Sequence, residues 1–153
     1  MPSRRTVLTA VASGAAALLA GCAGGSNSGK LSDTACHTSA RAHGDGDILS
    51  GGAMAMADGG QVRLSIPLDA EQVRETGMVA VELYVGDTLD RRIPVSADDR
   101  TYMDDDVANG QVRYEHVLGQ RPRHGEYRLV AVDGAGDSLD EVTISFNCFD
   151  EDG

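Results

Sequence analysis

The chain has 153 residues, which is enough for one domain of ordinary size and short for two. Hydrophobic residues make up 41% of it, close to the globular norm, and this excludes wholesale disorder. Aromatic residues make up only 4% and tryptophan is absent, which argues against a surface on which bases or sugars stack. The formal net charge of −11 argues against nucleic acid as a partner.

The charged residues are unusual in kind as well as in number. Of the 13 basic residues only Lys30 is a lysine, and 17 of the 24 acidic residues are aspartate. Such a surface repels itself in dilute salt, whereas molar salt shortens the Debye length to about 3 Å and screens the repulsion. The composition resembles that of salt-adapted, haloarchaeal proteins. The alternative is the acidic surface of a mesophilic protein.

The first 30 residues have the pattern of an export signal rather than of a fold. Arg4 and Arg5 stand in a segment without acids, and an apolar run follows over residues 7–20. The run ends in Leu19-Ala20-Gly21-Cys22, and a Gly/Ser-rich stretch comes next. The apolar run is too short and too rich in glycine for a helix that crosses about 30 Å of hydrocarbon, so a transmembrane anchor is not expected.

These residues resemble a twin-arginine export signal joined to a lipobox, although Val7 stands where phenylalanine is usual. The resemblance implies cleavage before Cys22, a lipid on the Cys22 sulfur and an anchor on the extracytoplasmic face of the cell membrane. It divides the chain into a signal peptide (1–21), a lipidated cysteine with a tether (22–33), a folded domain (34–150) and an acidic tail (151–153).

With Cys22 assigned to the lipid, Cys36 and Cys148 are left at opposite ends of the domain in an oxidising location. We therefore predict a disulfide between them that joins the first and last strands. In the chain-entropy model, closing a loop of about 110 residues stabilises the fold by roughly 4–5 kcal/mol. The alternative, a reactive pair, lacks the Cys-x-x-Cys spacing.

The domain shows a period of two, which is typical of β-strands. Val79, Val81, Leu83 and Val85 alternate with polar residues, and all four are expected to face the core. Residues 48–57 are ambiguous because glycines interrupt them. The other apolar runs fall at 62–68, 112–118, 127–132 and 142–148, and residues 89–95 can return as the partner strand after the turn at Gly86-Asp87. The run at 127–132 is apolar on both faces, as in a central strand. Cys148 alternates in step with the apolar residues of the last run, so its side chain is expected to face the core.

Turn signals separate these runs, and they fall at Gly86-Asp87, Asp98-Asp99, Asn109-Gly110, Gly125 and residues 134–137. A short helical turn is expected at 69–72 with Asp69 as its cap. The pattern predicts an all-β fold, an antiparallel β-sandwich of about seven strands. Residues 125–133 and 142–146 resemble the last two strands of immunoglobulin-like bacterial and archaeal surface domains, which implies an immunoglobulin-like sandwich.

No catalytic motif is present: the sequence has no Gly-x-Ser-x-Gly, His-Glu-x-x-His, phosphate loop or dinucleotide fingerprint. The chain is therefore predicted to be no enzyme and to need no cofactor. We expect a non-catalytic binding or cell-envelope interaction module, held to the membrane by its lipid, with an envelope or surface protein as partner.

Two constellations suggest metal handling instead. Asp104, Asp105 and Asp106, near Asp98 and Asp99, could supply oxygen ligands for calcium; the alternative is a solvated acidic loop. The second set supplies the nitrogen and thioether ligands that copper takes. It consists of His37, His43, Met54 and Met56, joined by Met103. Methionine pairs also fill cores, which is the alternative for Met54 and Met56.

One basic spot stands out on this acidic chain, at Arg121, Arg123 and His124. It could seat an anionic partner; the alternative is a hairpin tip whose charges balance nearby aspartates. His116 lies on an apolar parity and is expected to be a core or edge histidine.

Overall fold

The computed structural model describes residues 35–103 and 107–150. The predicted export and lipid residues Arg4, Arg5 and Cys22 lie outside the described residues, as do Asp104, Asp105, Asp106 and the tail 151–153. The described strands are β1 (Cys36–His43), β2 (Met54–Asp58), β3 (Gln61–Asp69), β4 (Met78–Val85), β5 (Thr88–Pro94), β6 (Gln111–Gln120), β7 (Arg123–Asp133) and β8 (Ser138–Cys148).

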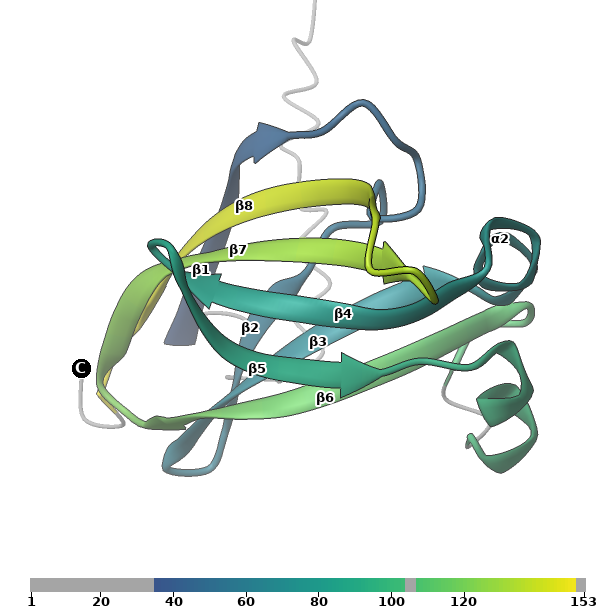
Figure 1. Ribbon diagram of the computed structural model, residues 1–153. Helices are drawn as coiled ribbons and strands as arrows, with labels where there is room; N and C mark the ends of the chain where they lie inside the picture. The colour runs from purple at the N-terminus through teal and green to yellow at the C-terminus, as the bar shows by residue number, and fades with distance from the viewer. Residues whose placement is uncertain (1–34, 104–106, 151–153) are drawn as a thin grey trace, which may run out of the picture.

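The strands form two antiparallel sheets that pack face to face (Figure 1). One sheet has the order β1-β8-β7-β4-β5 and the other the order β2-β3-β6. This confirms the predicted all-β antiparallel sandwich. The count is one higher than expected, because residues 36–43, which were not among the predicted runs, form β1 and the ambiguous stretch before residue 60 contributes β2.

The core lies between the two sheets and is built from alternating side chains, as the period of two predicts. Its largest fully buried members include Leu64 and Ile66 of β3, Leu129 of β7 and Ile144 of β8. The run at 127–132 belongs to β7, the middle strand of the larger sheet, which confirms the prediction of a central strand.

In β4 the predicted alternation is wrong at two positions. Val79 is 37% exposed and Val85 is 49% exposed, whereas Val81 and Leu83 are buried as expected. The pairing register with β7 shifts between Met78 and Ala80. A one-residue irregularity reverses the faces to which the residues on its two sides point. Met78, before the irregularity, therefore takes the core position that Val79 was expected to hold.

Cys36 and Cys148 are bonded to each other, as predicted. They lie directly opposite in the antiparallel pair of β1 and β8, and both are buried. The disulfide therefore joins the first described strand to the last across a sequence separation of 112 residues.

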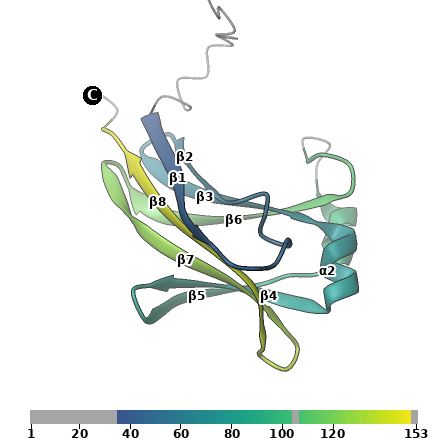
Figure 2. The same cartoon turned by 90° about the horizontal axis from the view of Figure 1, so that it is seen from above.

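Two short helices lie at the same end of the sandwich (Figures 1 and 2). The helix α2 (Ala70–Thr76) confirms the predicted helical turn and extends it: the Asp69 side chain accepts from the Gln72 N–H, and Gly77, with φ 70°, ends the helix. The expected loop at Asp98-Asp99 is instead part of a 3₁₀ helix, η1 (Ala97–Tyr102), which the Ser96 side chain caps.

The segment after β6 is not a hairpin tip. Since β6 belongs to the small sheet and β7 to the large one, residues 121–122 carry the chain from one sheet to the other. Gly125 and His124, which were expected in a turn, lie inside β7. Gly125 packs against a core ring there, because a Cβ on it would meet the Phe146 ring at the contact distance of 3.5 Å.

Candidate functional site

The outer face of the small sheet carries an open hollow of about 260 Å³. It is built from the segment before β2 and from all three strands of that sheet. Its lining residues are Gly51, Ala53, Met54, Met56, Ser65, Pro67 and Arg113.

The strand register brings these side chains together. Met54 of β2 lies opposite Ser65 of β3, and Pro67 of β3 lies opposite Arg113 of β6. Because successive side chains of a strand point to opposite faces, the outward residues of β3 alternate with the buried Leu64 and Ile66. The hollow is therefore a consequence of the pairing of three strands and not of one local motif.

Met54 and Met56 lie on one face of β2, as the sequence suggested, and they form one wall of the hollow. They are not core residues: Met54 is 56% exposed and Met56 is half-buried. Flexible thioether side chains can adapt to different shapes, and for this reason methionine is frequent at binding surfaces. The alternative interpretation of the pair as core filling is wrong for these two residues.

The structure does not join the predicted histidine ligands to this methionine pair. The His37 ring lies edge-on against Phe149, with 5.7 Å between ring centroids, and His43 pairs with Val142 at the far end of β1. Neither histidine lines the hollow. Met103 is also separate, because its sulfur accepts from the Arg113 backbone N–H at 3.1 Å and its side chain packs against the core.

Arg113 supplies the only charged group among the residues that line the hollow. Some other arginines on the sheets are neutralised: Arg92 pairs with Glu82 at 2.7 Å and Arg128 with Glu141 at 3.6 Å. Within residues 35–103 and 107–150, no acidic side chain forms an ion pair with Arg113. The hollow therefore has an apolar wall and one positive end.

A second hollow of about 240 Å³ adjoins the first and shares Met56 with it. It contains Asp58, Arg63 and Glu115, with Arg63 paired to both carboxylates. The hydrogen bond to Glu115 and the charge of Asp58 raise the pKa of Arg63 above its usual value. Two acids against one base leave this side of Met56 negative.

The basic spot predicted at Arg121, Arg123 and His124 is only partly free for a partner. The Arg121 guanidinium donates to two backbone carbonyls, through Nε to Phe149 at 2.8 Å and through Nη1 to Gly59 at 3.0 Å. Arg121 therefore ties the end of the large sheet to the β2–β3 turn. Arg123 and His124 are exposed at the start of β7.

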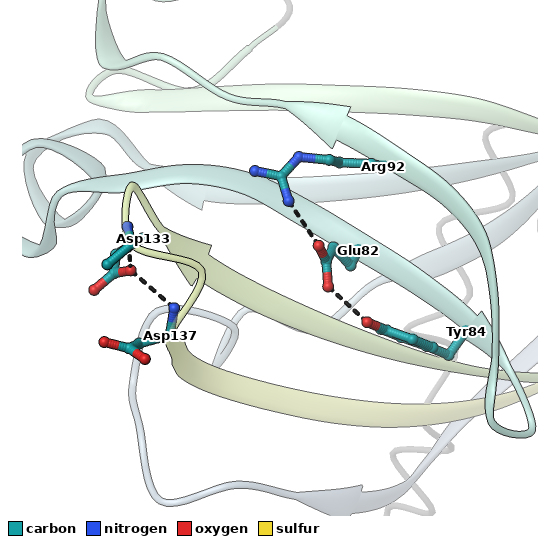
Figure 3. Close-up of polar contacts among 6 residues, drawn as sticks. Glu82, Tyr84, Arg92, Asp133 and Asp137 are labelled. Atoms are coloured by element: carbon teal, nitrogen blue, oxygen red, sulfur yellow. Dashed lines mark hydrogen bonds and ion pairs between the residues drawn. The ribbon is translucent and has the colours of Figure 1, made fainter.

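The acidic clusters do not form a cation site in the part of the chain that is described. No three His, Cys, Asp or Glu side chains there are placed to share a metal ion. Asp99 accepts a hydrogen bond of 2.6 Å from the Tyr114 hydroxyl. In the turn after β7, an Asp133 oxygen accepts from the backbone N–H groups of Ala135 and Asp137, as expected for a turn (Figure 3).

On the outer face of the large sheet, polar side chains form hydrogen bonds and an ion pair with one another. Glu82 accepts from Arg92 and from the Tyr84 hydroxyl, both at 2.7 Å (Figure 3). The bond to Glu82 raises the pKa of Tyr84, and Arg128 lies over the Tyr84 ring at 4.5 Å. These contacts surround a small buried cluster of Ala80, Val130 and Val132. The arrangement stabilises the outer face of the large sheet.

Sequence reasoning missed Asp140, the one described acid that is fully buried, at 5% exposure. Its carboxylate accepts from the backbone N–H groups of Gly46, Leu49 and Glu141. The sequence contains a pattern that could have identified it, because Asp140 alternates in step with Val142 and the later apolar residues of β8, which face the core. A charged residue on that parity points to a buried anchor for a distant loop.

A comparison of the chain with protein-family models, curated proteins and solved structures finds no significant match. The immunoglobulin-like resemblance therefore stays a prediction. Among the described residues, no helix is long and apolar enough to cross a membrane.

Proposed function

We propose that this chain is a lipid-anchored protein on the extracytoplasmic face of the cell membrane, where it acts by binding and not by catalysis. The anchor is supported by the sequence pattern from Arg4 and Arg5 to Cys22. The location is supported by the disulfide between Cys36 and Cys148, since such bonds persist in oxidising compartments.

The observation that carries the binding role is the hollow on the small sheet. It exposes apolar side chains beside one cation that no described acid pairs, which is the composition of a small recognition site. We further propose that the sandwich is immunoglobulin-like and that the organism is a salt-adapted archaeon. The immunoglobulin-like fold is supported by the adjacent antiparallel strands β7 and β8, whose residues carry the resemblance. The salt-adapted source is supported by the aspartate-rich composition.

The anchor is tested by replacing Cys22 with serine in the native host. Cys22→Ser removes the sulfur that would carry the lipid, so the protein should move from the membrane fraction to the soluble fraction. Ser26→Ala, a change in the same Gly/Ser stretch, should leave it on the membrane. The intact mass of the membrane form should exceed that of residues 22–153 by the lipid. Retention of Cys22→Ser on membranes after a high-salt wash would overturn the anchor.

Metal handling is a second candidate, favoured by one observation. Met54 and Met56 present two thioethers to the same hollow, and copper(I) prefers such soft ligands. One copper per chain after anaerobic loading, lost in the double variant Met54→Leu/Met56→Leu and kept in Met78→Leu, would favour this candidate. Calcium would depend on Asp104, Asp105 and Asp106, which lie outside the described residues.

A further inference from the structure

We infer that the hollow bounded by Met54, Met56 and Arg113 binds a short apolar chain that carries one carboxylate. This inference rests on the proposed binding function and names the ligand class for the same site. It follows from the size of the hollow, the chemistry of its two ends and the charge of its surroundings.

The size of the hollow limits the ligand. Its volume of about 260 Å³ lies just below the range of about 300–1,000 Å³ that is usual for drug-sized ligands. At roughly 30 Å³ for each water in the liquid, about nine waters would fill it. A ligand with a similar number of non-hydrogen atoms therefore fits, such as a branched six-carbon acid or the last side chain and carboxylate of a peptide.

The positive end explains the carboxylate. Arg113 lines the hollow without an ion-pair partner in the described part of the chain, and a planar guanidinium matches a carboxylate with two parallel hydrogen bonds. Between Arg113 and the methionines lies Ser65, whose neighbour on β2 is Met54. This order along the hollow separates the site for a charge from the site for an apolar body.

The charge of the neighbouring hollow sets the expected direction of the ligand. Glu115 lies opposite Ser65 and is paired with Arg63, which also pairs with Asp58. Two carboxylates against one guanidinium leave the hollow around Arg63 with a net negative charge that repels an anion. The carboxylate is expected at Arg113 and the apolar tail along Met54 and Met56. Among the described residues, the acids of the same sheet face, Asp58 and Glu115, are paired with Arg63 and not with Arg113.

The test uses the methionine methyl groups as reporters. The full chain carrying Cys22→Ser is labelled with ¹³C in its methionine methyl groups and titrated with 4-methylpentanoate at a fixed salt concentration. The Met54 and Met56 signals should shift and saturate, while the signal of Met78, buried in the core, should stay in place. For a ligand of this size we expect a Kd on the order of 1 mM.

Two comparisons isolate the charge. 4-Methylpentanamide has the same body without the charge, so it should bind about tenfold more weakly or worse. Arg113→Gln should weaken the acid by a similar factor and leave the amide unchanged. Arg41→Gln is the matched control, because it removes an exposed arginine from the other sheet and should change nothing. If Arg113→Gln does not fold, the acid and amide comparison on the parent protein still decides.

A second titration separates two sources of the same chemistry. Acetyl-Ala-Leu with a free carboxylate represents the C-terminus of a protein, whereas 4-methylpentanoate represents a free acid. Tighter binding of either one supports the inference and identifies the source. No saturable shift with either acid, equal binding of acid and amide, or equal loss in Arg113→Gln and Arg41→Gln would overturn it. None of these results depends on the lipid, so the anchor and the ligand class fail separately.

Discussion

Arg121 and Asp140 have the character of surface residues in the sequence, yet both bind backbone groups that the sheets leave unpaired. The Arg121 guanidinium donates to the carbonyls of Gly59 and Phe149, where three chain segments meet. Asp140 accepts the N–H groups of a loop that ends in the buried Leu49. Buried backbone groups need partners, and a charged side chain can supply several at once.

The buried aspartate gives a prediction about stability. Asp140→Ala should lower the free energy of unfolding by about 2–4 kcal/mol, because it leaves the buried N–H of Leu49 and the part-buried N–H of Gly46 without acceptors. Asp133→Ala is the matched control: Asp133 also accepts two backbone N–H groups, but in an exposed turn. That change should cost less than about 1 kcal/mol. Urea unfolding at constant salt measures both.

The comparison of the two variants tests burial and not the number of hydrogen bonds. Equal losses for Asp140→Ala and Asp133→Ala would mean that burial of the carboxylate contributes nothing, and the anchoring role of Asp140 would then be wrong. Hydrogen exchange of the Leu49 amide gives an independent check, because it should speed up in Asp140→Ala alone.

At the scale of strands, alternation predicted most of the sandwich. The runs that became β3, β6 and β8 were identified because one face of each is regularly apolar, and the run that became β7 because it is apolar on both faces. The strand β5 was expected as the return strand after the turn signal at Gly86-Asp87. The parity of β4 was not predictable, since the irregularity near Val79 changes which residues face inward without changing the composition. The strand β2 was ambiguous because Gly51 and Gly52 interrupt the stretch at 48–57 just before it.

The candidate site was predictable only in part, for the same kind of reason. The positions of Met54 and Met56 on one face follow from their spacing of two residues. Arg113 reaches them only through the register of β3 with β2 and with β6, and no spacing in the sequence encodes that pairing. Asp140 and Arg121 bind partners that are distant in the sequence, and long-range contacts of this kind depend on the whole topology.

The edge strand β6 carries a prediction about pH. His116 lies on the inner face of β6, half-buried, opposite Leu64. Burial lowers the pKa of His116 below its usual value, and the nearby charge of Arg91 lowers it further against the opposing effect of Asp90. As the pH falls, the unfolded chain therefore takes up a proton at His116 before the folded chain does.

The sign of the effect follows from proton linkage. The folded state is favoured above the ordinary histidine pKa of about 6.5, and this stability is lost as the pH falls from there through the lowered pKa of His116. His116→Gln should therefore lose less stability than the parent protein between about pH 7 and pH 5. Val117→Gln, a matched substitution at the exposed next position of β6, should keep the parent's pH dependence. Urea midpoints across this range measure the difference, and identical profiles for all three proteins would contradict it.

At the scale of the whole molecule, the contacts that hold the sandwich together are opposed by repulsion among its negative charges. The disulfide joins β1 to β8, and α2 and η1 lie together at one end of the sandwich, so the described fold is tied at both of its ends. The net charge of −11 acts against this closure, because like charges on a small surface repel one another when salt is scarce. Only a few acids of the described sheets, such as Glu82 and Glu115, have an arginine partner.

Salt should therefore decide how stable the molecule is. Dilution from molar salt to about 0.1 M lengthens the Debye length from about 3 Å to about 10 Å, so carboxylates that were screened from one another begin to interact. The thermal midpoint followed by circular dichroism should fall on dilution. The triple variant Asp45→Asn/Glu75→Gln/Asp87→Asn removes three exposed acids that take part in no described ion pair, and its midpoint should fall less. A thermal midpoint of the parent protein that does not depend on salt would contradict salt adaptation. An equal fall of the midpoint in both proteins would assign the effect to the hydrophobic core, because concentrated salt also strengthens hydrophobic burial.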